Sequence, residues 1–378
     1  MTGAVIAGYA RSPLTLANKG ALIRTRPDDL AAAVVKALVE RTGIDPATIE
    51  DLVLGCAFPE GEQGLNVARN IVFLAGLPNS VAGTTINRFC GSSMQAIHTA
   101  AGSIALGAGE AFICAGIESM TRIPMPGFNP MLNPKLVKAG HAAYMGMGET
   151  AENLANKYDI ARDKQDAFAV ESHKRAAAAQ SSGKFDDEIV PIETRDGVVD
   201  KDGCIRPDTT MEILGDLKPA FDQNGSVTAG TSSPLTDGSA AVLLTSEAYA
   251  EKHGLKPLAR IKSIAVAGCD PEIMGIGPVN ATNKALERAG LKLDDIDVIE
   301  LNEAFAAQSL AVIHDLNLDL SKTNIDGGAI ALGHPLGATG ARITGKAAHI
   351  MQREGKKYAL ATQCIGGGQG IATVLEAL

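Results

Sequence analysis

Short apolar runs rich in β-branched residues alternate with amphipathic runs along the first third of the chain. Four of these apolar runs have the length and composition of buried strands, at 5–9, 52–57, 81–86 and 111–115. Apolar side chains recur at helical spacing in the segments between them, at 28–41, 65–74 and 93–106. The alternating order predicts a mostly parallel sheet with helices on both faces.

The same order of elements returns in the last third of the chain. Helices are expected at 279–289, 304–316 and 338–353, and strands at 259–267, 298–301, 323–326, 358–362 and 371–375. A strand at 239–245 completes the first series. Both series then read β-α-β-α-β-α-β-β, and a duplication of this length is a strong indication of architecture. We expect one half from residues 1–116 plus 236–257, and a second half from residues 258–378.

Residues 117–235 interrupt the pattern and differ in composition. Prolines and methionines crowd residues 119–148, amphipathic helices are predicted at 149–158 and 163–179, and residues 186–215 look irregular or short-stranded. Because a structureless loop of this length is improbable in a compact domain, we expect a folded insertion. Methionines suit an adaptable apolar binding wall, although filling of an irregular core explains them equally well.

Composition narrows the class of protein. The chain has 378 residues and a formal charge of −9, which argues against a general nucleic-acid binder because such a protein needs a basic face. No apolar run approaches the length of a membrane span, and the first residues lack the regions of a secretory signal. The 6 cysteines show no CxxC or Cys/His pairing, which disfavours a zinc site and a disulfide framework. A reduced, cytoplasmic location is expected.

Four polar or nucleophilic residues fall at predicted element ends. Cys90 lies where a strand passes into a helix, and the helix N-terminus there would favour a thiolate. Asn302, His334 and Cys364 lie at predicted carboxyl ends of strands in the second half, the usual edge for a site in an open α/β sheet. Each alone has an ordinary explanation as a buried thiol, a helix cap, a loop histidine or a turn residue. Together at one sheet edge they predict an active site.

Five motifs make the chain resemble the thiolases over its whole length. They are NRFCGSSMQA at 87–96, VTAGTSSPLTDG at 227–238, NEAF at 302–305, GGAIALGHPLGATGAR at 327–342 and CIGGGQG at 364–370. The first two, with GCDPEIMGIGPV at 268–279, look closer to the degradative 3-ketoacyl-CoA thiolases of fatty-acid β-oxidation than to the biosynthetic enzymes. The resemblance implies an α/β thiolase-like fold: two duplicated βαβαβαββ halves in a layered α-β-α-β-α core, with an inserted loop domain for CoA and the acyl chain.

The resemblance also implies a role for each catalytic residue. Cys90 matches the nucleophile that carries the acyl group, and Cys364 matches the acid/base that acts on the carbon α to the thioester and on the CoA thiol. His334 is expected to hydrogen-bond the Cys90 sulfur and to help hold the thioester oxygen, for which Asn302 orients a water. The N–H groups of Cys90 and Gly366 would form a second oxyanion hole.

Further matches concern the substrate. Ser233 matches a contact to the pantetheine arm, and Met147 and Phe305 match residues that line the acyl pocket. Acetoacetyl-specific relatives often have His where this chain has Gly146, which predicts a wider channel for medium or long acyl chains. The resemblance implies no cofactor and no metal, with coenzyme A as a substrate. Basic residues that could hold its phosphates include Arg206, Lys218 and Arg260, without a choice among them.

Several alternatives stay open on sequence alone. Thiolytic cleavage of 3-ketoacyl-CoA is reversible as a Claisen condensation, so an acetoacetyl-CoA thiolase is the first alternative. A ketosynthase of the same superfamily fits less well, because NEAF and a second cysteine in CxGGG favour thiolase. A non-catalytic acyl-CoA-binding protein on this fold would not need Cys364. The family implies a homodimer or homotetramer, and the chain could also serve as the thiolase subunit of a β-oxidation complex.

Overall fold

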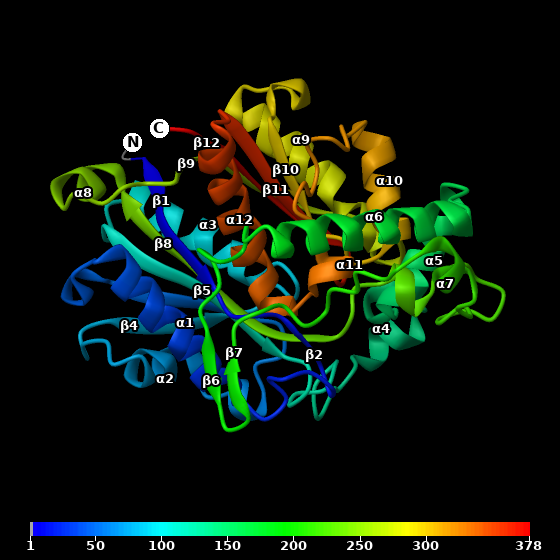
Figure 1. Ribbon diagram of the computed structural model, residues 1–378, viewed down its shortest axis with the longest axis horizontal. Helices are drawn as coiled ribbons and strands as arrows, with labels where there is room; N and C mark the ends of the chain where they lie inside the picture. Colours follow the sequence, from blue (N-terminus) through cyan, green and yellow to red (C-terminus); the bar gives the residue numbers. More distant parts are fainter. Residues whose placement is uncertain (1–2) are drawn as a thin grey trace.

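One large sheet runs through the computed structural model, which describes residues 3–378 (Figure 1). Its strand order is β10-β11-β12-β9-β1-β8-β5-β3-β4, and β2 pairs with β8 outside this path. The strands are β1 (Ala4–Arg11), β2 (Thr15–Leu16), β3 (Asp51–Cys56), β4 (Ala82–Ile86), β5 (Ala111–Ser119), β8 (Thr236–Ser246), β9 (Ala259–Gly268), β10 (Val298–Leu301), β11 (Tyr358–Ile365) and β12 (Gln369–Glu376). The two halves of the sheet join where β1 pairs briefly with β9, through Val5 and Ile6.

Helices cover both faces of each half, as the alternating pattern predicts. The helices α1 (Pro27–Thr42) and α2 (Val67–Leu74) lie outside the first half, and α9 (Gly277–Ala289) and α10 (Ala306–Leu316) outside the second. Between the halves lie α3 (Ser92–Ala105) and α12 (Thr339–Glu354), which pack on each other and on both parts of the sheet (Figure 1). Three buried apolar clusters fill the space between the helices and the sheet in these layers. The predicted duplicated, layered α/β fold is confirmed. The prediction of a mostly parallel sheet is wrong: β3 pairs in parallel with β4 and β5, and β10 with β11, whereas the other six strand pairings of this sheet are antiparallel, because β8, β9 and β12 run against their neighbours.

One predicted strand is wrong. Residues 323–326 form no strand, and only Thr323 makes an isolated bridge to Ile299 of β10. Asn324 adopts a left-handed backbone with φ of +47°. Its side-chain amide instead accepts from the N–H of Leu301 at 2.9 Å and donates to the carbonyl of Leu301 at 2.8 Å. A side chain thus replaces the backbone ladder that the apolar pattern predicted.

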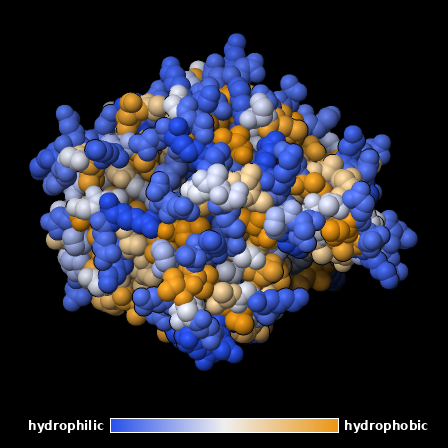
Figure 2. Space-filling view, viewed as in Figure 1, coloured by the Kyte–Doolittle hydropathy of each residue, from blue (hydrophilic) through white to orange (hydrophobic). Residues whose placement is uncertain are grey.

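The insertion is folded, in agreement with the prediction. It contains α4 (Pro134–Lys138), α5 (Met147–Lys157), α6 (Arg162–Ser181), the hairpin of β6 (Ile192–Thr194) and β7 (Gly197–Val199), and α7 (Met211–Gly215). Two short helices outside it, α8 (Glu247–Lys252) and α11 (Ala329–Leu332), were not predicted. Figure 2 shows apolar side chains among polar ones at the right-hand edge, where Figure 1 places α5 and α7. Within residues 3–378 no helix has both the length and the apolar character of a membrane span.

Buried ion pairs tie the insertion to the core. Arg11, at the end of β1, contacts Asp202 at 2.7 Å and Glu188 at 2.9 Å. Glu188 also contacts Lys346 of α12 at 3.2 Å. All of these side chains are nearly inaccessible to solvent, so removing one partner would leave an uncompensated buried charge. The insertion is therefore held in a defined position against β1 and α12.

Candidate active site

A tight turn between β4 and α3 presents Cys90. Phe89 has a left-handed backbone, with φ of +42°, which is unusual for a bulky residue. Its N–H donates to the side chain of Asn87 at 2.7 Å, and its carbonyl accepts from the hydroxyl of Ser92 at 2.6 Å. The predicted position of Cys90 at a strand-to-helix turn is confirmed. Such a strained turn is common where a side chain must be aimed at a ligand.

The sulfur of Cys90 is buried near two backbone N–H groups. The residue is 8% exposed, and the N–H groups of Gly366 and of Cys90 itself lie close enough to lower the pKa of the thiol. Burial nevertheless raises the pKa of the Cys90 thiol to about 11, and the field of Glu118 acts in the same direction. The resting group is therefore a thiol, and the thiolate predicted from the helix N-terminus is wrong for this state. The converging N–H groups of Cys90 and Gly366 agree with the predicted oxyanion hole.

Cys364 lies close to Cys90 in an apolar environment. It occupies the end of β11 and is 1% exposed. Burial raises its pKa well above the usual value, and the neighbouring Cys90 raises it further. It belongs to one apolar cluster with Phe305 and Met274, against which Met147 packs. The structure therefore brings the two predicted cysteines together as neutral thiols.

His334 is held in a single tautomer. The hydroxyl of Thr339 donates to the carbonyl of Pro335 at 3.0 Å, so its oxygen accepts from Nδ1 of His334 at 2.6 Å. Nε2 then carries the lone pair, and it accepts from the amide nitrogen of Asn302 at 3.4 Å. Burial and the Arg342 charge lower the pKa of His334 to about 3. A neutral imidazole whose Nε2 carries no proton can take one from a nucleophile once the long contact to Asn302 gives way.

The expected bond from His334 to Cys90 does not occur in this resting structure. Within residues 3–378 no hydrogen bond joins His334 to the sulfur. The loop of His334 still packs against the nucleophile, because Leu336 and Cys90 share one buried apolar cluster. The side-chain oxygen of Asn302 is buried and lacks a partner among the described residues, so it can accept from a water or a substrate group.

The predicted substrate residues border the two cysteines. A Cβ on Gly366 would lie 3.5 Å from the sulfur of Met147, so Met147 covers this glycine. Phe305 stacks edge-on with Phe221, with ring centroids 5.8 Å apart. Ser233 is half-buried, and its N–H donates to the carbonyl of Ala304 at 2.9 Å. Binding of the acyl chain and of CoA by these residues stays a prediction.

Three further side chains at the site were missed from the sequence. Gln363 donates to the carbonyl of Cys90. Arg88 donates to Gln369 at 2.7 Å and so links the turn of Cys90 to the loop of Gly366. Glu118 accepts hydrogen bonds at the end of β5. A charged residue at the end of an apolar strand was the available signal for Glu118, but nothing in the sequence indicated its partners.

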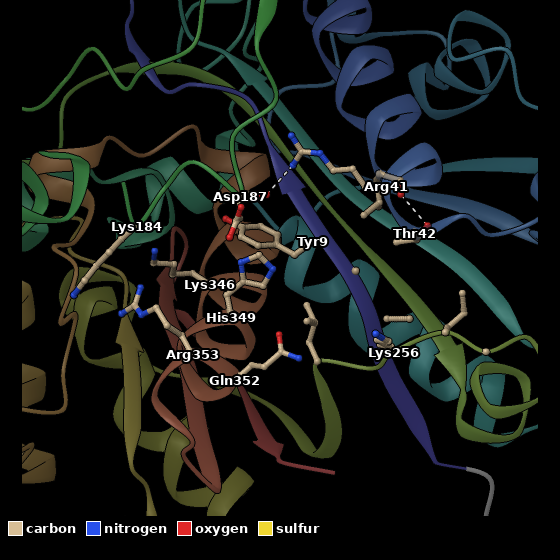
Figure 3. A pocket seen from close by; sticks show the side chains of 16 residues that line it. Tyr9, Arg41, Thr42, Lys184, Asp187, Lys256, Lys346, His349, Gln352 and Arg353 are labelled. Carbon is tan, nitrogen blue, oxygen red and sulfur yellow. Dashed lines mark hydrogen bonds between the residues drawn. The ribbon is translucent and has the colours of Figure 1, made fainter. Parts of the chain in front are cut away.

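A cavity of about 650 Å³ lies away from this chemistry (Figure 3). It lies between the C-terminal parts of α1 and α12, whereas His334 precedes the N-terminus of α12. Two of its basic side chains are engaged in buried ion pairs, Lys346 with Asp326 at 3.0 Å and Arg353 with Asp326 at 2.7 Å. None of the predicted catalytic residues lines it. The chemistry is therefore assigned to the cysteines and not to this cavity.

Known protein families match almost the whole chain. The profile described as "Thiolase, N-terminal domain" matches residues 4–248, and that described as "Thiolase, C-terminal domain" matches residues 255–377. The chain is 49% identical over 389 residues to a 3-ketoacyl-CoA thiolase of Bacillus subtilis (strain 168), with 100% of each chain covered. It is 51% identical over 383 residues to a 3-ketoacyl-CoA thiolase of Marinobacter nauticus, covering 98% of this chain and 97% of that one.

Solved structures show the same fold. Human mitochondrial 3-ketoacyl-CoA thiolase in complex with CoA superposes with a TM-score of 0.92 at 40% identity, covering 100% of this chain and 98% of that one. The acetyl-CoA acetyltransferase of Bacillus anthracis also gives a TM-score of 0.92, at 43% identity, covering 100% of this chain and 99% of that one.

Proposed function

Because the chain belongs to the thiolase family, we propose that it cleaves 3-ketoacyl-CoA with CoA, giving acetyl-CoA and a shortened acyl-CoA. It is thus an acyltransferase that works through an acyl group carried on Cys90. The observation that carries this proposal is the meeting of two buried thiols, with the backbone N–H groups of Cys90 and Gly366 near the sulfur of one of them. A binding protein would not need the second thiol.

The first half-reaction breaks a carbon–carbon bond. Nε2 of His334 takes the Cys90 proton, and the sulfur attacks the 3-keto carbon of the substrate. The N–H groups of Cys90 and Gly366 hold the resulting oxyanion. The bond between C2 and C3 then breaks, and Cys364 gives its proton to C2. Acetyl-CoA leaves, and the shortened acyl group stays on Cys90 as a thioester.

The second half-reaction transfers that acyl group to CoA. The Cys364 thiolate left by the first step takes the proton of the CoA thiol, and the CoA sulfur attacks the acyl-enzyme. Collapse of the tetrahedral intermediate releases the shortened acyl-CoA and leaves Cys90 as a thiolate, to which Nε2 of His334 returns the proton that it took in the first half-reaction. The order is ping-pong, and its reverse is a Claisen condensation. His334 and Asn302 would hold the thioester oxygen of the acetyl-CoA enolate, since the free oxygen of Asn302 can accept from a bound water.

The acyl channel favours chains longer than four carbons. A Cβ added at Gly146 would meet only atoms of Glu149, at 3.6 Å or more, so no side chain narrows the approach there. Relatives named 3-ketoacyl-CoA thiolase support this preference. The alternative is an acetoacetyl-CoA thiolase, which the close superposition on an acetyl-CoA acetyltransferase favours.

The decisive experiment is CoA-dependent loss of 3-ketoacyl-CoA for substrates of four to sixteen carbons, with wild type compared with Cys90→Ala. We expect activity that rises beyond four carbons and vanishes in the variant. Activity confined to four carbons would favour the acetoacetyl-CoA enzyme. No activity at any length would favour the binding-protein alternative.

A second variant separates the two cysteines. Cys364→Ala keeps the nucleophile and lacks the proton donor to C2, so we expect some acylation of Cys90 by an acyl-CoA while C–C bond formation nearly stops. Mass spectrometry of the acyl-enzyme measures the acylation of Cys90. Formation of acetoacetyl-CoA measures C–C bond formation. Unchanged condensation in Cys364→Ala would remove this thiol from the mechanism.

We also propose that the protein is a homodimer or homotetramer in the cytoplasm. All 6 cysteines are free, which suits a reducing compartment. β4 is an edge strand of the sheet, and near it Leu65 is 93% exposed with a left-handed backbone, φ +55°. An open edge beside exposed apolar side chains suits a subunit contact. Participation in a β-oxidation complex stays a prediction.

The reaction proposed here needs no cofactor or metal beyond coenzyme A as a substrate. The thiols, the imidazole and the backbone N–H groups supply each proton transfer and each charge stabilisation in the two steps. Among the basic residues considered for the CoA phosphates, Arg260 is engaged in ion pairs with Glu247 at 2.5 Å and Glu376 at 3.2 Å. Arg206 and Lys218 remain the better choices.

A further inference from the structure

Glu118 is a buried carboxylate at the end of β5 that no catalytic step uses. It is 1% exposed, and it makes no ion pair among residues 3–378. Its partners are four N–H donors and the thiol of Cys56, whose sulfur lies 3.8 Å from one oxygen. One oxygen accepts from the backbone of Ala57 at 2.8 Å and of Gly337 at 2.9 Å, and the other accepts from the Gln63 amide at 2.7 Å and the backbone of Phe58 at 3.3 Å.

This donor set indicates an ionised group. A carboxylate offers about four lone-pair sites, and here each one receives an N–H. A proton on either oxygen of Glu118 would face a donor instead of an acceptor. Burial raises the pKa of Glu118, but the four donors stabilise its charged form. Glu118 is therefore a negative charge satisfied by neutral amides.

Two of the donors, Ala57 and Gly337, connect Glu118 to the Cys90 turn and to the His334 turn. Ala57 accepts from the amide of Asn87 at 3.0 Å, and Asn87 in turn accepts from the backbone of Phe89 in the turn of Cys90. Gly337 belongs to the turn that carries His334. A Cβ at Gly337 would lie 2.8 Å from the Cα of Cys56 and 2.9 Å from a carboxylate oxygen of Glu118, so only glycine allows this approach.

The surroundings of Cys90 confirm that Glu118 lies close to the chemistry. Ala57, Leu336 and Cys90 share one buried apolar cluster, and Phe58 packs against it. The charge of Glu118 acts on the Cys90 thiol, and the other titratable groups of the site are neutral: the Cys364 thiol and the His334 imidazole. The charge on Glu118 thus meets no ion-pair partner among the described residues.

We propose that Glu118 is a positioning residue for the reaction: by accepting from Ala57 and Gly337, its ionised carboxylate fixes the spacing of the Cys90 and His334 loops, and it places a negative charge near the Cys90 sulfur. Only the expected change in kcat rests on the proposed function. The nucleophile and its base come from opposite halves of the chain, and an error of about 1 Å in such a pair can cost about 10²-fold in rate.

The test uses Glu118→Gln, which keeps the shape but removes the charge and two acceptor sites. We expect the kcat of thiolysis to fall about 10²-fold with little change in KM. The rate at which iodoacetamide alkylates Cys90 should instead rise. Loss of this neighbouring negative charge removes one of the causes that raise the thiol pKa, so alkylation should become faster at any pH below the titration midpoint. Mass spectrometry of the peptide with Cys90 measures it.

Two matched variants complete the design. Glu118→Asp keeps the charge with a shorter reach, so it should alkylate like wild type while its kcat falls by a smaller factor. Glu354→Gln neutralises a partly exposed carboxylate at the C-terminal end of α12, the end opposite the His334 loop, and it should leave the alkylation of Cys90 unchanged.

Each outcome decides the proposal. Faster alkylation of Cys90 together with slower thiolysis in Glu118→Gln supports it if Cys114, a buried cysteine whose pKa Glu118 does not affect, is alkylated as slowly as in wild type, because general loss of structure would expose both. Wild-type kcat, or an unchanged alkylation rate, overturns it. If Glu118→Gln does not fold, a wild-type kcat in Glu118→Asp overturns it. Alkylation needs no substrate, so it still reports on Glu118 if wild type shows no thiolysis and the proposed function fails.

Discussion

At the scale of single residues, the site consists of groups held in their neutral forms. Burial raises the pKa of both thiols, and it lowers the pKa of His334 to about 3. A thiol and an imidazole can exchange a proton only when substrate brings them together, since no hydrogen bond joins them in the resting structure. The apolar surroundings therefore delay formation of the reactive thiolate until the substrate is in place.

The low pKa of His334 predicts how acylation depends on pH. An ordinary histidine, with a pKa of 6.5, would lose its basic nitrogen as the pH falls through that value, but His334 protonates only near pH 3. We therefore expect the rate of acyl-enzyme formation to show no acid limb between about pH 5 and 8. Rapid-quench measurement across this range checks it.

His334→Ala is the control for that profile. It should slow acylation by about 10²–10⁴-fold, as is typical of a lost acid/base group. An acid limb near the ordinary histidine pKa, present in wild type and absent in His334→Ala, would contradict the neutral imidazole.

At the scale of elements, short turns place the chemistry and the helices after them hold it. Cys90 precedes α3, the loop of His334 precedes α12, and Met147 begins α5. The helices α3 and α12 are the two central ones, so the turns that precede them meet at the middle of the molecule. Met147, at the beginning of α5, lies over Gly366 and so borders the approach to Cys90.

Gly146, directly before α5, provides a test of substrate length. Gly146→His should fit the fold, because a Cβ there meets only Glu149 at ordinary contact distances. The added ring beside Met147 narrows the acyl channel, so activity on chains beyond four carbons should fall about tenfold relative to the four-carbon substrate. Steady-state kinetics over the chain-length series measures the ratio.

A second glycine gives the matched control. Gly215→His, at the exposed end of α7, places a ring where a Cβ would meet nothing within 4 Å and should leave the chain-length ratio unchanged. An unchanged ratio in Gly146→His would mean that this position does not set the width of the channel.

At the scale of the whole molecule, the open edge of the sheet predicts assembly. Leu65 is 93% exposed in a left-handed conformation near β4, an arrangement that costs free energy unless another surface covers it. We expect Leu65→Asp to weaken the dimer by at least about tenfold, since it places a charge in an apolar contact. Sedimentation velocity over a concentration series measures the association.

Leu320→Asp is the control, because Leu320 is 46% exposed on the second half, away from β4. It should leave the association unchanged. Equal association in Leu65→Asp and wild type would place the subunit contact elsewhere, and a wild type that is monomeric throughout would contradict the proposed dimer.

Local pattern was sufficient for most elements of the fold. The spacing of apolar residues along the chain distinguishes a strand from a helix, and this spacing can be read from a short segment. For this reason β10 and α9 follow the predicted segments closely. The strand predicted at 323–326 failed because the side chain of Asn324 bonds to Leu301, and no local pattern reports a partner so far along the chain.

The sequence by itself determined the duplicated α/β architecture, the positions of both cysteines and the family. Only the tertiary structure decided the charge states and the partners, because these depend on burial and on contacts between distant segments. Cys90 looked like a thiolate from its helix terminus, yet the surrounding core makes it a thiol. Glu118 fell beyond the predicted strand at 111–115 and inside the predicted insertion, yet it lies within β5, and segments from both halves of the chain supply its four N–H donors. Solvent exclusion and long-range hydrogen bonding have no local signature, so they had to be read from the folded chain.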